Sequence, residues 1–167
     1  MKKAVCPGSF DPITNGHLDI ISRASKIFDQ VTILISHNMD KNCAFTVEER
    51  ARFVQLATTD YSNVQVDVFD GLLAQYIEKH QIVAIVKGLR AISDFEYEFQ
   101  MALANRMLAE KAETIFLPTS TQHMYLSSSL VKQIAQFEGD ITPFVPESIR
   151  EEVFNKLKKR RADHERK

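Results

Sequence analysis

The segment PGSFDPITNGH, residues 7–17, combines at close spacing several residue types that hold phosphate oxygens. Gly8 and Gly16 allow the backbone to approach a ligand closely, and Ser9 supplies a hydroxyl. His17 falls in the first turn of a predicted helix, where backbone N–H groups point outward. Its imidazole can therefore donate a hydrogen bond to a phosphate oxygen, although a single histidine is by itself more often solvated or structural.

Later loops carry the same kinds of group, namely cations, hydroxyls and helix N-termini. They follow the ends of predicted strands, and they are Lys41, Lys87, Gly88, Arg90, residues 120–123, Ser127, Ser128 and Ser129. Considered one at a time, Lys41 is typical of a solvated loop and residues 127–129 are typical of a helix cap. If they converge at one place, they form a site for a polyphosphate ligand.

Several familiar motifs are absent from the sequence. It has no GxxxxGK[ST] loop and no GxGxxG fingerprint, which argues against P-loop kinases and dinucleotide-dependent dehydrogenases. It has no GxSxG elbow, and Ser9 has no evident base within local reach, which argues against covalent catalysis. The remaining chemistry is phosphoryl or nucleotidyl transfer by positioning and charge stabilisation.

The sequence predicts no metal site built from protein ligands. No His, Cys and Asp residues have metal-ligand spacing, whereas Mg²⁺ held mainly by the phosphates of a ligand is compatible with the chain. Cys6 and Cys43 form no CxxC pair, so we expect two reduced thiols without a catalytic role.

Short apolar segments alternate with amphipathic segments along the chain. Strands are predicted at residues 4–6, 31–36, 64–69, 82–87 and 114–117. Helices are predicted at residues 16–28, from 46, 72–80, 94–110, 127–137 and from 146 toward 160. The pairs Thr46–Glu49 and Ser93–Glu96 have the spacing of capping boxes at two of these helix starts.

The predicted strands are apolar throughout, which is typical of a parallel sheet covered on both faces. We therefore predict an α/β fold, a doubly wound (Rossmann-like) sheet of five parallel strands with helices on both faces and a C-terminal helix. Ligands of such sheets bind at the carboxyl ends of the strands, where the polar loops would meet.

The 167 residues, 44% of them hydrophobic, suit one domain, which we expect over residues 1–160. Residues 156–167 carry seven basic and two acidic side chains, and residues 161–167 are expected to form a basic tail. A helix end in solvent explains this charge more simply than nucleic-acid binding. The longest apolar run, residues 82–86, is too short to span a bilayer, so we expect a cytoplasmic protein without a membrane partner.

Three segments resemble the motifs of a known family. TNGH at residues 14–17 matches the (H/T)xGH motif of the nucleotidyltransferase superfamily. KGLRAISDFEYEFQMALANR at residues 87–106 and YLSSSLVKQ at residues 125–133 resemble the bacterial phosphopantetheine adenylyltransferases. The resemblance extends over nearly the whole chain, and GLRAxxDFEYE is much more specific than TxGH.

This resemblance implies transfer of the adenylyl group of ATP to 4′-phosphopantetheine, with Mg²⁺, giving dephospho-coenzyme A and pyrophosphate. That reaction is the penultimate step of coenzyme A biosynthesis. It implies a homohexamer as well, with coenzyme A as a further candidate ligand. A phosphate monoester is largely dianionic near neutral pH, so we expect direct in-line attack without a general base or a covalent enzyme intermediate.

The resemblance also implies roles for individual residues. The implied catalytic residues are His17, Lys41, Arg90 and Ser128. The implied ATP site comprises Ser9, Phe10, His17, Gly88, Leu89, Arg90, Glu98, His123, Met124, Tyr125, Leu126, Ser127, Ser128 and Ser129. The implied acceptor site comprises Ser9, Lys41, Leu73 and Lys87. Lys87 stands where arginine is common in the family, so it keeps the charge but lacks the planar two-nitrogen fork.

Alternatives remain at this level. TxGH alone also fits transfer to nicotinamide mononucleotide, flavin mononucleotide or glycerol phosphate. A non-enzymatic module that binds a nucleotide or coenzyme A could use the same sheet edge. Binding of nucleic acid by the basic C-terminus would show a steep salt dependence.

Overall fold

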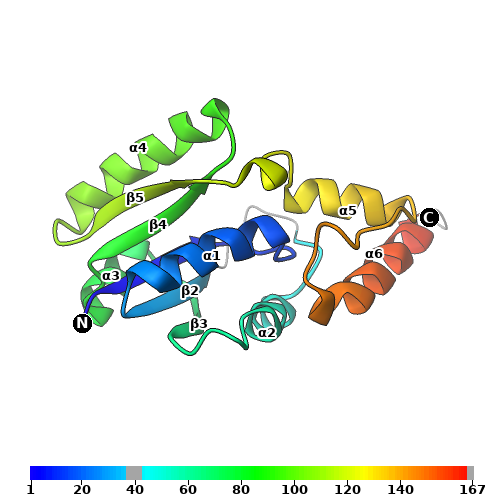
Figure 1. Ribbon diagram of the computed structural model, residues 1–167, viewed down its shortest axis with the longest axis horizontal. Coiled ribbons are helices and arrows are strands. Elements are labelled where there is room, and N and C mark those ends of the chain that lie inside the picture. Colours follow the sequence, from blue (N-terminus) through cyan, green and yellow to red (C-terminus); the bar gives the residue numbers. More distant parts are fainter. Residues whose placement is uncertain (37–42, 165–167) are drawn as a thin grey trace.

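The computed structural model describes residues 1–36 and 43–164, in which five strands alternate with helices (Figure 1). The strands are β1 (Lys3–Gly8), β2 (Gln30–Ser36), β3 (Val64–Phe69), β4 (Ala84–Leu89) and β5 (Glu113–Pro118). The helices are α1 (Asn15–Ile27), α2 (Val47–Ala57), α3 (Leu73–His80), α4 (Ile92–Leu108), α5 (Ser128–Gln136) and α6 (Arg150–His164), with 3₁₀ turns η1 (Thr121–His123) and η2 (Glu147–Ile149).

All five strands are parallel, in the order β3-β2-β1-β4-β5. The chain builds outward from β1 to β3 and then returns to add β4 and β5 on the other side. The order therefore reverses between β1 and β4, which is where doubly wound sheets bind their ligands. The prediction of a doubly wound parallel sheet is confirmed.

The pairing between β1 and β4 is short. It joins only Ala4 with Ala84 and Val5 with Ile85, whereas each of the other three strand pairs is in register over six residues. Beyond Val5 and Ile85, β1 and β4 are no longer paired with each other, although each stays paired with its outer neighbour. The sheet is thus open at the carboxyl ends of β1 and β4.

Successive residues of β1 face opposite sides of the sheet, as strand geometry requires. Ala4 and Cys6 belong to one buried cluster, to which α1, α2, α5 and α6 also contribute. Val5 belongs to a second cluster with buried side chains of α3. Helices therefore cover both faces of β1, which explains why this strand lacks a polar face. The edge strand β3 differs from the apolar pattern predicted for every strand, because Gln65 and Asp67 share one of its faces.

Two of the predicted helix starts have different outcomes. Thr46 and Glu49 form the predicted capping box: the Glu49 carboxylate accepts from the Thr46 N–H at 2.7 Å, and Thr46 Oγ1 accepts from the Glu49 N–H at 3.3 Å. The predicted start of α4 is wrong, because this helix begins at Ile92 with Ala91 as its N-cap. There the Asp94 carboxylate accepts from the backbone N–H of Arg90 at 3.3 Å.

The C-terminal part of the described chain is helical as far as His164, so α6 includes residues 161–164 of the predicted tail. Within residues 1–36 and 43–164, none of the helices combines the length and the apolar character needed to cross a bilayer.

Candidate active site

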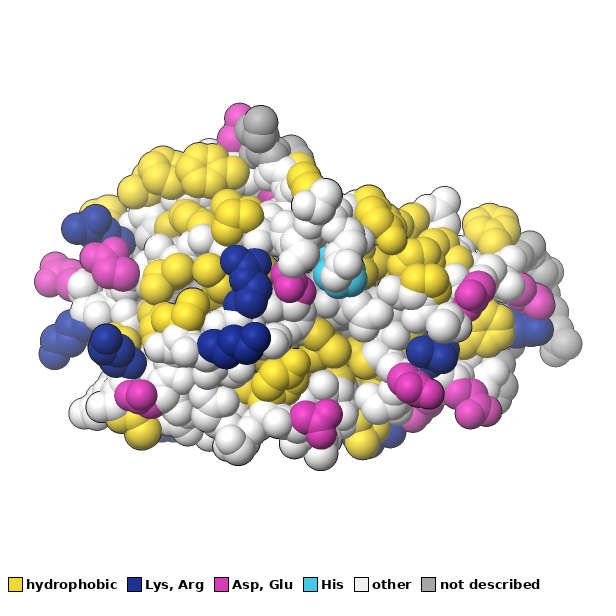
Figure 2. Space-filling view, in the orientation of Figure 1, with side chains coloured by type: hydrophobic (Ala, Val, Ile, Leu, Met, Phe, Trp, Pro, Cys, Tyr) yellow, Lys and Arg dark blue, Asp and Glu magenta, His cyan; other side chains and the backbone are white. Residues whose placement is uncertain are grey.

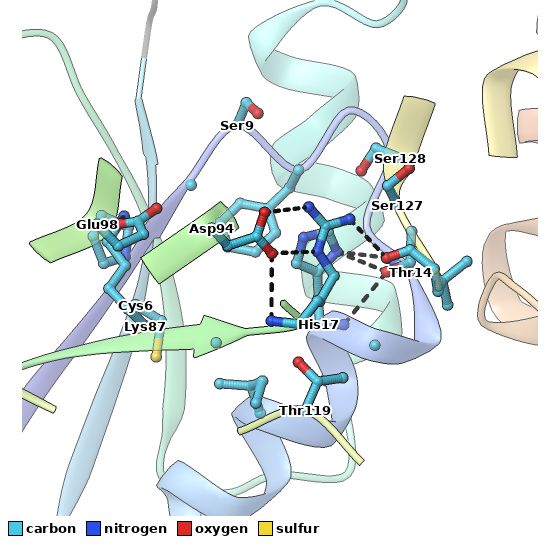
Figure 3. Close-up of a pocket in the computed structure, with 18 of the residues that line it drawn as sticks. Cys6, Ser9, Thr14, His17, Lys87, Asp94, Glu98, Thr119, Ser127 and Ser128 are labelled. Atoms are coloured by element: carbon cyan, nitrogen blue, oxygen red, sulfur yellow. Dashed lines mark hydrogen bonds and ion pairs between the residues drawn. The ribbon is translucent and has the colours of Figure 1, made fainter. Parts of the chain in front are cut away.

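A cavity of about 660 Å³ lies at the carboxyl ends of β1 and β4, between the loops that follow them (Figure 3). Its walls come from residues 6–17, residues 86–98 and the start of α5. The predicted site residues that line it are Ser9, Phe10, His17, Lys87, Gly88, Arg90, Glu98, Leu126, Ser127, Ser128 and Ser129. The sheet therefore brings together groups from three distant parts of the sequence.

His17 is held by Thr14 at the start of α1. Thr14 is the N-cap residue, and its Oγ1 accepts from the His17 backbone N–H at 3.4 Å. In return the Thr14 backbone N–H donates to His17 Nδ1 at 3.0 Å. The spacing of Thr14 and His17 in the TNGH motif is therefore that of a capping box, with histidine in the position usually taken by Glu or Gln.

This contact fixes the tautomer of His17. A backbone N–H can only donate, so Nδ1 must be unprotonated and Nε2 must carry the ring proton. Burial, reinforced by the charge of Arg90, lowers the pKa of His17 from 6.5 to about 4. At neutral pH His17 is thus an uncharged donor through Nε2–H, and the Phe10 ring packs edge-on against it with 5.1 Å between the centroids.

Arg90 follows the end of β4 and contacts two other elements. Its Nε donates to Asp94 Oδ2 at 3.0 Å and its Nη2 to Asp94 Oδ1 at 3.3 Å. Its Nη1 donates to the backbone oxygen of Leu126 at 3.0 Å, which connects β4 to the segment before α5. Arg90 therefore presents a positive charge in a defined orientation.

Lys87 lies near the end of β4, with its Nζ 3.1 Å from Glu98 Oε2 on α4. Both residues line the cavity, and Figure 3 shows them on the side of it opposite to Ser127 and Ser128. Burial raises the pKa of the neighbouring Cys6 thiol to about 12, against the opposing charge of Lys87. Cys6 therefore stays protonated at neutral pH and cannot act as a thiolate nucleophile.

The N-terminus of α5 supplies the third wall of the site. Ser127 is its N-cap, and Ser127 Oγ accepts from the Leu130 N–H at 3.1 Å. Ser128 Oγ donates to the backbone oxygen of Pro12 at 2.8 Å, which fixes the helix start against the loop after β1. The serines are thus a helix cap and line the cavity as well, so the structural and functional interpretations of them are compatible.

Not every predicted residue lines the cavity. Leu89, in β4, and Leu73, which begins α3, are not among the described lining residues, nor are His123, Met124 and Tyr125. The predicted end of the fourth strand, residue 87, is two residues early, so Gly88 and Leu89 lie within β4. Lys41 lies outside the described residues.

Asp11 does not line the cavity but supports its walls, a role that the sequence analysis did not assign to it. It is 4% exposed, and its carboxylate accepts from the N–H groups of Ala44 and Phe45 at 2.9 to 3.0 Å. Lys132 of α5 donates to Asp11 Oδ2 at 2.7 Å. Asp11 thereby joins the loop after β1 to α5 and to the residues before α2. Its place within PGSFDPITNGH was the available signal, but no spacing pointed to Ala44.

Arg50 was missed as well. This α2 side chain is 2% exposed and donates through Nη1 to the backbone oxygens of Ser9 at 2.7 Å and Ser36 at 3.4 Å. It therefore holds the ends of β1 and β2 together behind the cavity. An arginine within the EER segment of an amphipathic helix gives no local sign of burial.

The arrangement suits group transfer between phosphates. It offers a neutral N–H donor, two cations, a helix N-terminus and hydroxyl groups around one cavity. Among the described residues no three His, Cys, Asp or Glu side chains are grouped so that they could hold a metal ion.

Comparison with known proteins defines the class. The sequence model of the cytidylyltransferase-like family matches residues 5–134 of the chain. A solved structure of a candidate nicotinate-nucleotide adenylyltransferase from Vibrio parahaemolyticus superimposes with a TM-score of 0.70. It covers 92% of this chain and 99% of the other at 21% identity, and it supports the fold alone. The fold, the site and the family match define a nucleotidyltransferase.

Curated relatives narrow the class further. A phosphopantetheine adenylyltransferase of Alkaliphilus metalliredigens is 54% identical over 149 residues, which are 89% of this chain and 95% of the relative. Another, of Alkaliphilus oremlandii, is 52% identical over 157 residues, 94% of this chain and 100% of the relative. The chain belongs to the phosphopantetheine adenylyltransferase family, as its GLRAISDFEYE segment predicted.

Proposed function

We propose that this protein transfers the adenylyl group of ATP to 4′-phosphopantetheine, giving dephospho-coenzyme A and pyrophosphate. The names of its relatives support this assignment of substrates. The observation that carries it is the meeting of His17 Nε2–H, the Arg90 guanidinium and the start of α5 around one cavity. Each of these groups stabilises negative charge on phosphate oxygens.

The proposed chemistry is a direct displacement. An oxygen of the acceptor phosphate attacks the α-phosphorus of ATP, and the bond from that phosphorus to the pyrophosphate oxygen breaks. The acceptor is already largely dianionic near neutral pH, so no base has to remove a proton. The barrier comes from bringing anions together, and His17, Arg90 and the α5 N-terminus offset that repulsion.

The two substrates would occupy different parts of the cavity. ATP would lie toward His17, Arg90 and residues 126–129, with Gly88 and Glu98 beside it, and would extend past the cavity toward Leu89 and residues 123–125. The acceptor would lie toward Ser9 and Lys87, with Leu73 along its pantetheine arm. Lys41 is a further candidate for the acceptor phosphate, as the resemblance implies. Dephospho-coenzyme A and coenzyme A carry both the adenylyl group and the pantetheine arm, so they would span the two parts of the same site.

We propose that Mg²⁺ enters with ATP, held mainly by its phosphates, where it neutralises part of their charge. The donor set fits this assignment, because the cavity carboxylates Asp94 and Glu98 each lie against a cation, Arg90 and Lys87 respectively. A protein-based metal cage would require these carboxylates to leave their partners.

We also propose that the protein acts as a cytoplasmic homo-oligomer, a hexamer by resemblance to its family. The support on this chain is an apolar surface on α4. Its exposed side chains are Phe95, Tyr97, Phe99, Met101, Leu103, Met107 and Leu108. Figure 2 shows hydrophobic side chains gathered over the region of α4 and β5. Such a large apolar patch is typical of an interface between subunits.

One assay tests the reaction. The purified protein is incubated with ATP, Mg²⁺ and, separately, phosphopantetheine, nicotinamide mononucleotide, flavin mononucleotide or glycerol phosphate, and pyrophosphate release is measured. We expect pyrophosphate release only when phosphopantetheine is the acceptor. No release with that acceptor would overturn the proposed function, and binding of ATP without any release would favour a non-enzymatic binding module.

A further inference from the structure

The orientation of Arg90 depends on Asp94, one helical turn away on α4. Asp94 Oδ2 accepts a hydrogen bond from Nε of the guanidinium, and Oδ1 accepts one from Nη2 (Figure 3). Oδ2 also accepts from the backbone N–H of Arg90. Asp94 therefore holds both the main chain and the side chain of Arg90. The Leu126 carbonyl accepts a hydrogen bond from Nη1 and so fixes the third nitrogen.

The proton count shows what remains for a ligand. A guanidinium carries five N–H protons, one on Nε and two on each terminal nitrogen. Hydrogen bonds to Asp94 and Leu126 use one N–H of each of the three nitrogens. One proton therefore remains on Nη1 and one on Nη2, and two such donors on a planar group match two oxygens of a phosphate.

We propose that Asp94 is a positioning residue of the transfer reaction, which sets the plane of Arg90 so that its two remaining N–H groups meet the phosphates of ATP. This inference rests on the proposed function. It adds a residue to which neither the sequence motifs nor the family resemblance gave a role.

The second ion pair of the cavity, Lys87 with Glu98, differs from that of Arg90 with Asp94 in geometry. Lys87 and Glu98 meet through a single oxygen, Oε2, for which the described residues provide no hydrogen bond of good geometry. A lysine ammonium has no plane to set. Asp94 and Arg90 meet through two oxygens and two nitrogens, and such a bidentate pair fixes orientation as well as distance.

The variant Asp94→Asn keeps the size of the side chain but loses one of the two carboxylate acceptors. We expect kcat to fall about 10- to 100-fold, because a small misplacement of a charged group is costly in the transition state. The KM for ATP should change less than kcat. Asp94→Glu retains two acceptor oxygens and should restore most of the rate.

A double-mutant cycle separates positioning from a structural effect. Arg90→Lys removes the planar group, so adding Asp94→Asn to Arg90→Lys should lower kcat no further. Glu152→Gln is the matched control, because it neutralises a carboxylate paired with Arg52 outside the cavity. It should leave kcat unchanged. Thermal unfolding of each variant establishes that it is folded in the assay.

The outcomes are distinct. A wild-type protein that releases no pyrophosphate would overturn the proposed function, and this inference with it. An active wild type would overturn the inference alone if Asp94→Asn kept the full kcat. The same conclusion would follow if the Asp94→Asn and Arg90→Lys effects on log kcat simply added. A ten-fold or larger fall that vanishes in the Arg90→Lys background would support it.

Discussion

At the scale of single residues, the Thr14 amide decides what His17 can do. Because Nδ1 accepts from the Thr14 N–H, the ring offers only its Nε2 proton to a ligand. The low pKa, about 4, keeps the ring neutral, so Nδ1 still accepts from the Thr14 N–H near pH 6.5 and Nε2–H keeps its orientation. His17 is therefore suited to stabilise charge that develops on a phosphate rather than to remove a proton.

This role predicts different effects of two substitutions. His17→Ala removes the donor, and we expect kcat to fall about 100- to 1,000-fold with a smaller change in KM, because the hydrogen bond strengthens in the transition state. His17→Gln keeps an acceptor for the Thr14 N–H and an N–H donor toward the cavity, so it should regain part of the rate. Steady-state kinetics with ATP and phosphopantetheine give both constants. An unchanged kcat in His17→Ala would contradict the role.

The same pKa predicts a pH dependence of stability. Between pH 6.5 and about 4 the unfolded chain binds a proton at residue 17 that the folded protein does not bind. Stability from His17 is thus complete above pH 6.5 and is lost as the pH falls toward 4. The loss is at most about 3 kcal/mol. Urea unfolding at several pH values should show a smaller acid loss for His17→Gln than for the wild type. Parallel curves for the two proteins would contradict the lowered pKa.

At the scale of elements, Asp11 holds three parts of the site together. Asp11→Ala leaves the buried N–H groups of Ala44 and Phe45 without their acceptor and removes the partner of Lys132. We expect the free energy of unfolding in urea to fall by about 2–4 kcal/mol. Asp60→Ala, at an exposed position, should change it by less than about 0.5 kcal/mol. Equal effects of the two substitutions would show that the Asp11 contacts contribute little.

Local signals explain which elements the sequence predicted. Short apolar runs that alternate with helical patterns predicted all five strands, and Thr46 with Glu49 marked the start of α2, because capping involves residues three apart. The predicted start of α4, residue 94, was wrong because the helix begins at Ile92. Its N-cap position holds an alanine, and Asp94 instead accepts from the Arg90 N–H. Contacts such as that of Asp11 with Ala44 join residues 33 apart, and no periodicity reports them.

The candidate site was predictable for a different reason. The carboxyl ends of parallel strands share one edge, so polar residues after successive strands meet whatever the details of packing. This rule placed His17, Arg90 and Ser127 together. The rule could not predict the hydrogen-bond partners of these residues. His17 takes the capping-box position that Glu usually occupies, and the pairing of Arg90 with Asp94 depends on where α4 begins.

At the scale of the whole molecule, the exposed apolar side chains of α4 are typical of a surface that becomes buried between subunits. Met107 is 85% exposed and Leu103 is 52% exposed. A charge at both positions, Leu103→Glu with Met107→Glu, should dissociate the oligomer, because burying unpaired carboxylates is costly. Light scattering after size exclusion should give six times the 19.1 kDa chain mass for the wild type and a smaller mass for the variant.

Ile27→Glu is the control for this experiment. Ile27 is 56% exposed at the end of α1, so its substitution tests the effect of an added charge outside the α4 surface. It should leave the mass unchanged. A wild type of single-chain mass, or a double variant of unchanged mass, would contradict the assignment of this surface.

The short pairing of β1 with β4 has a consequence for cohesion. Two residue pairs join the halves β3-β2-β1 and β4-β5, so the centre of the sheet has fewer cross-strand bonds than its sides. The cavity is lined by the ends of both β1 and β4, so a ligand bound there would contact both halves. Its binding energy then also opposes separation of the halves, since a ligand that binds only the folded state stabilises that state. With the proposed function, substrate binding would thus help to hold the two halves of the sheet together.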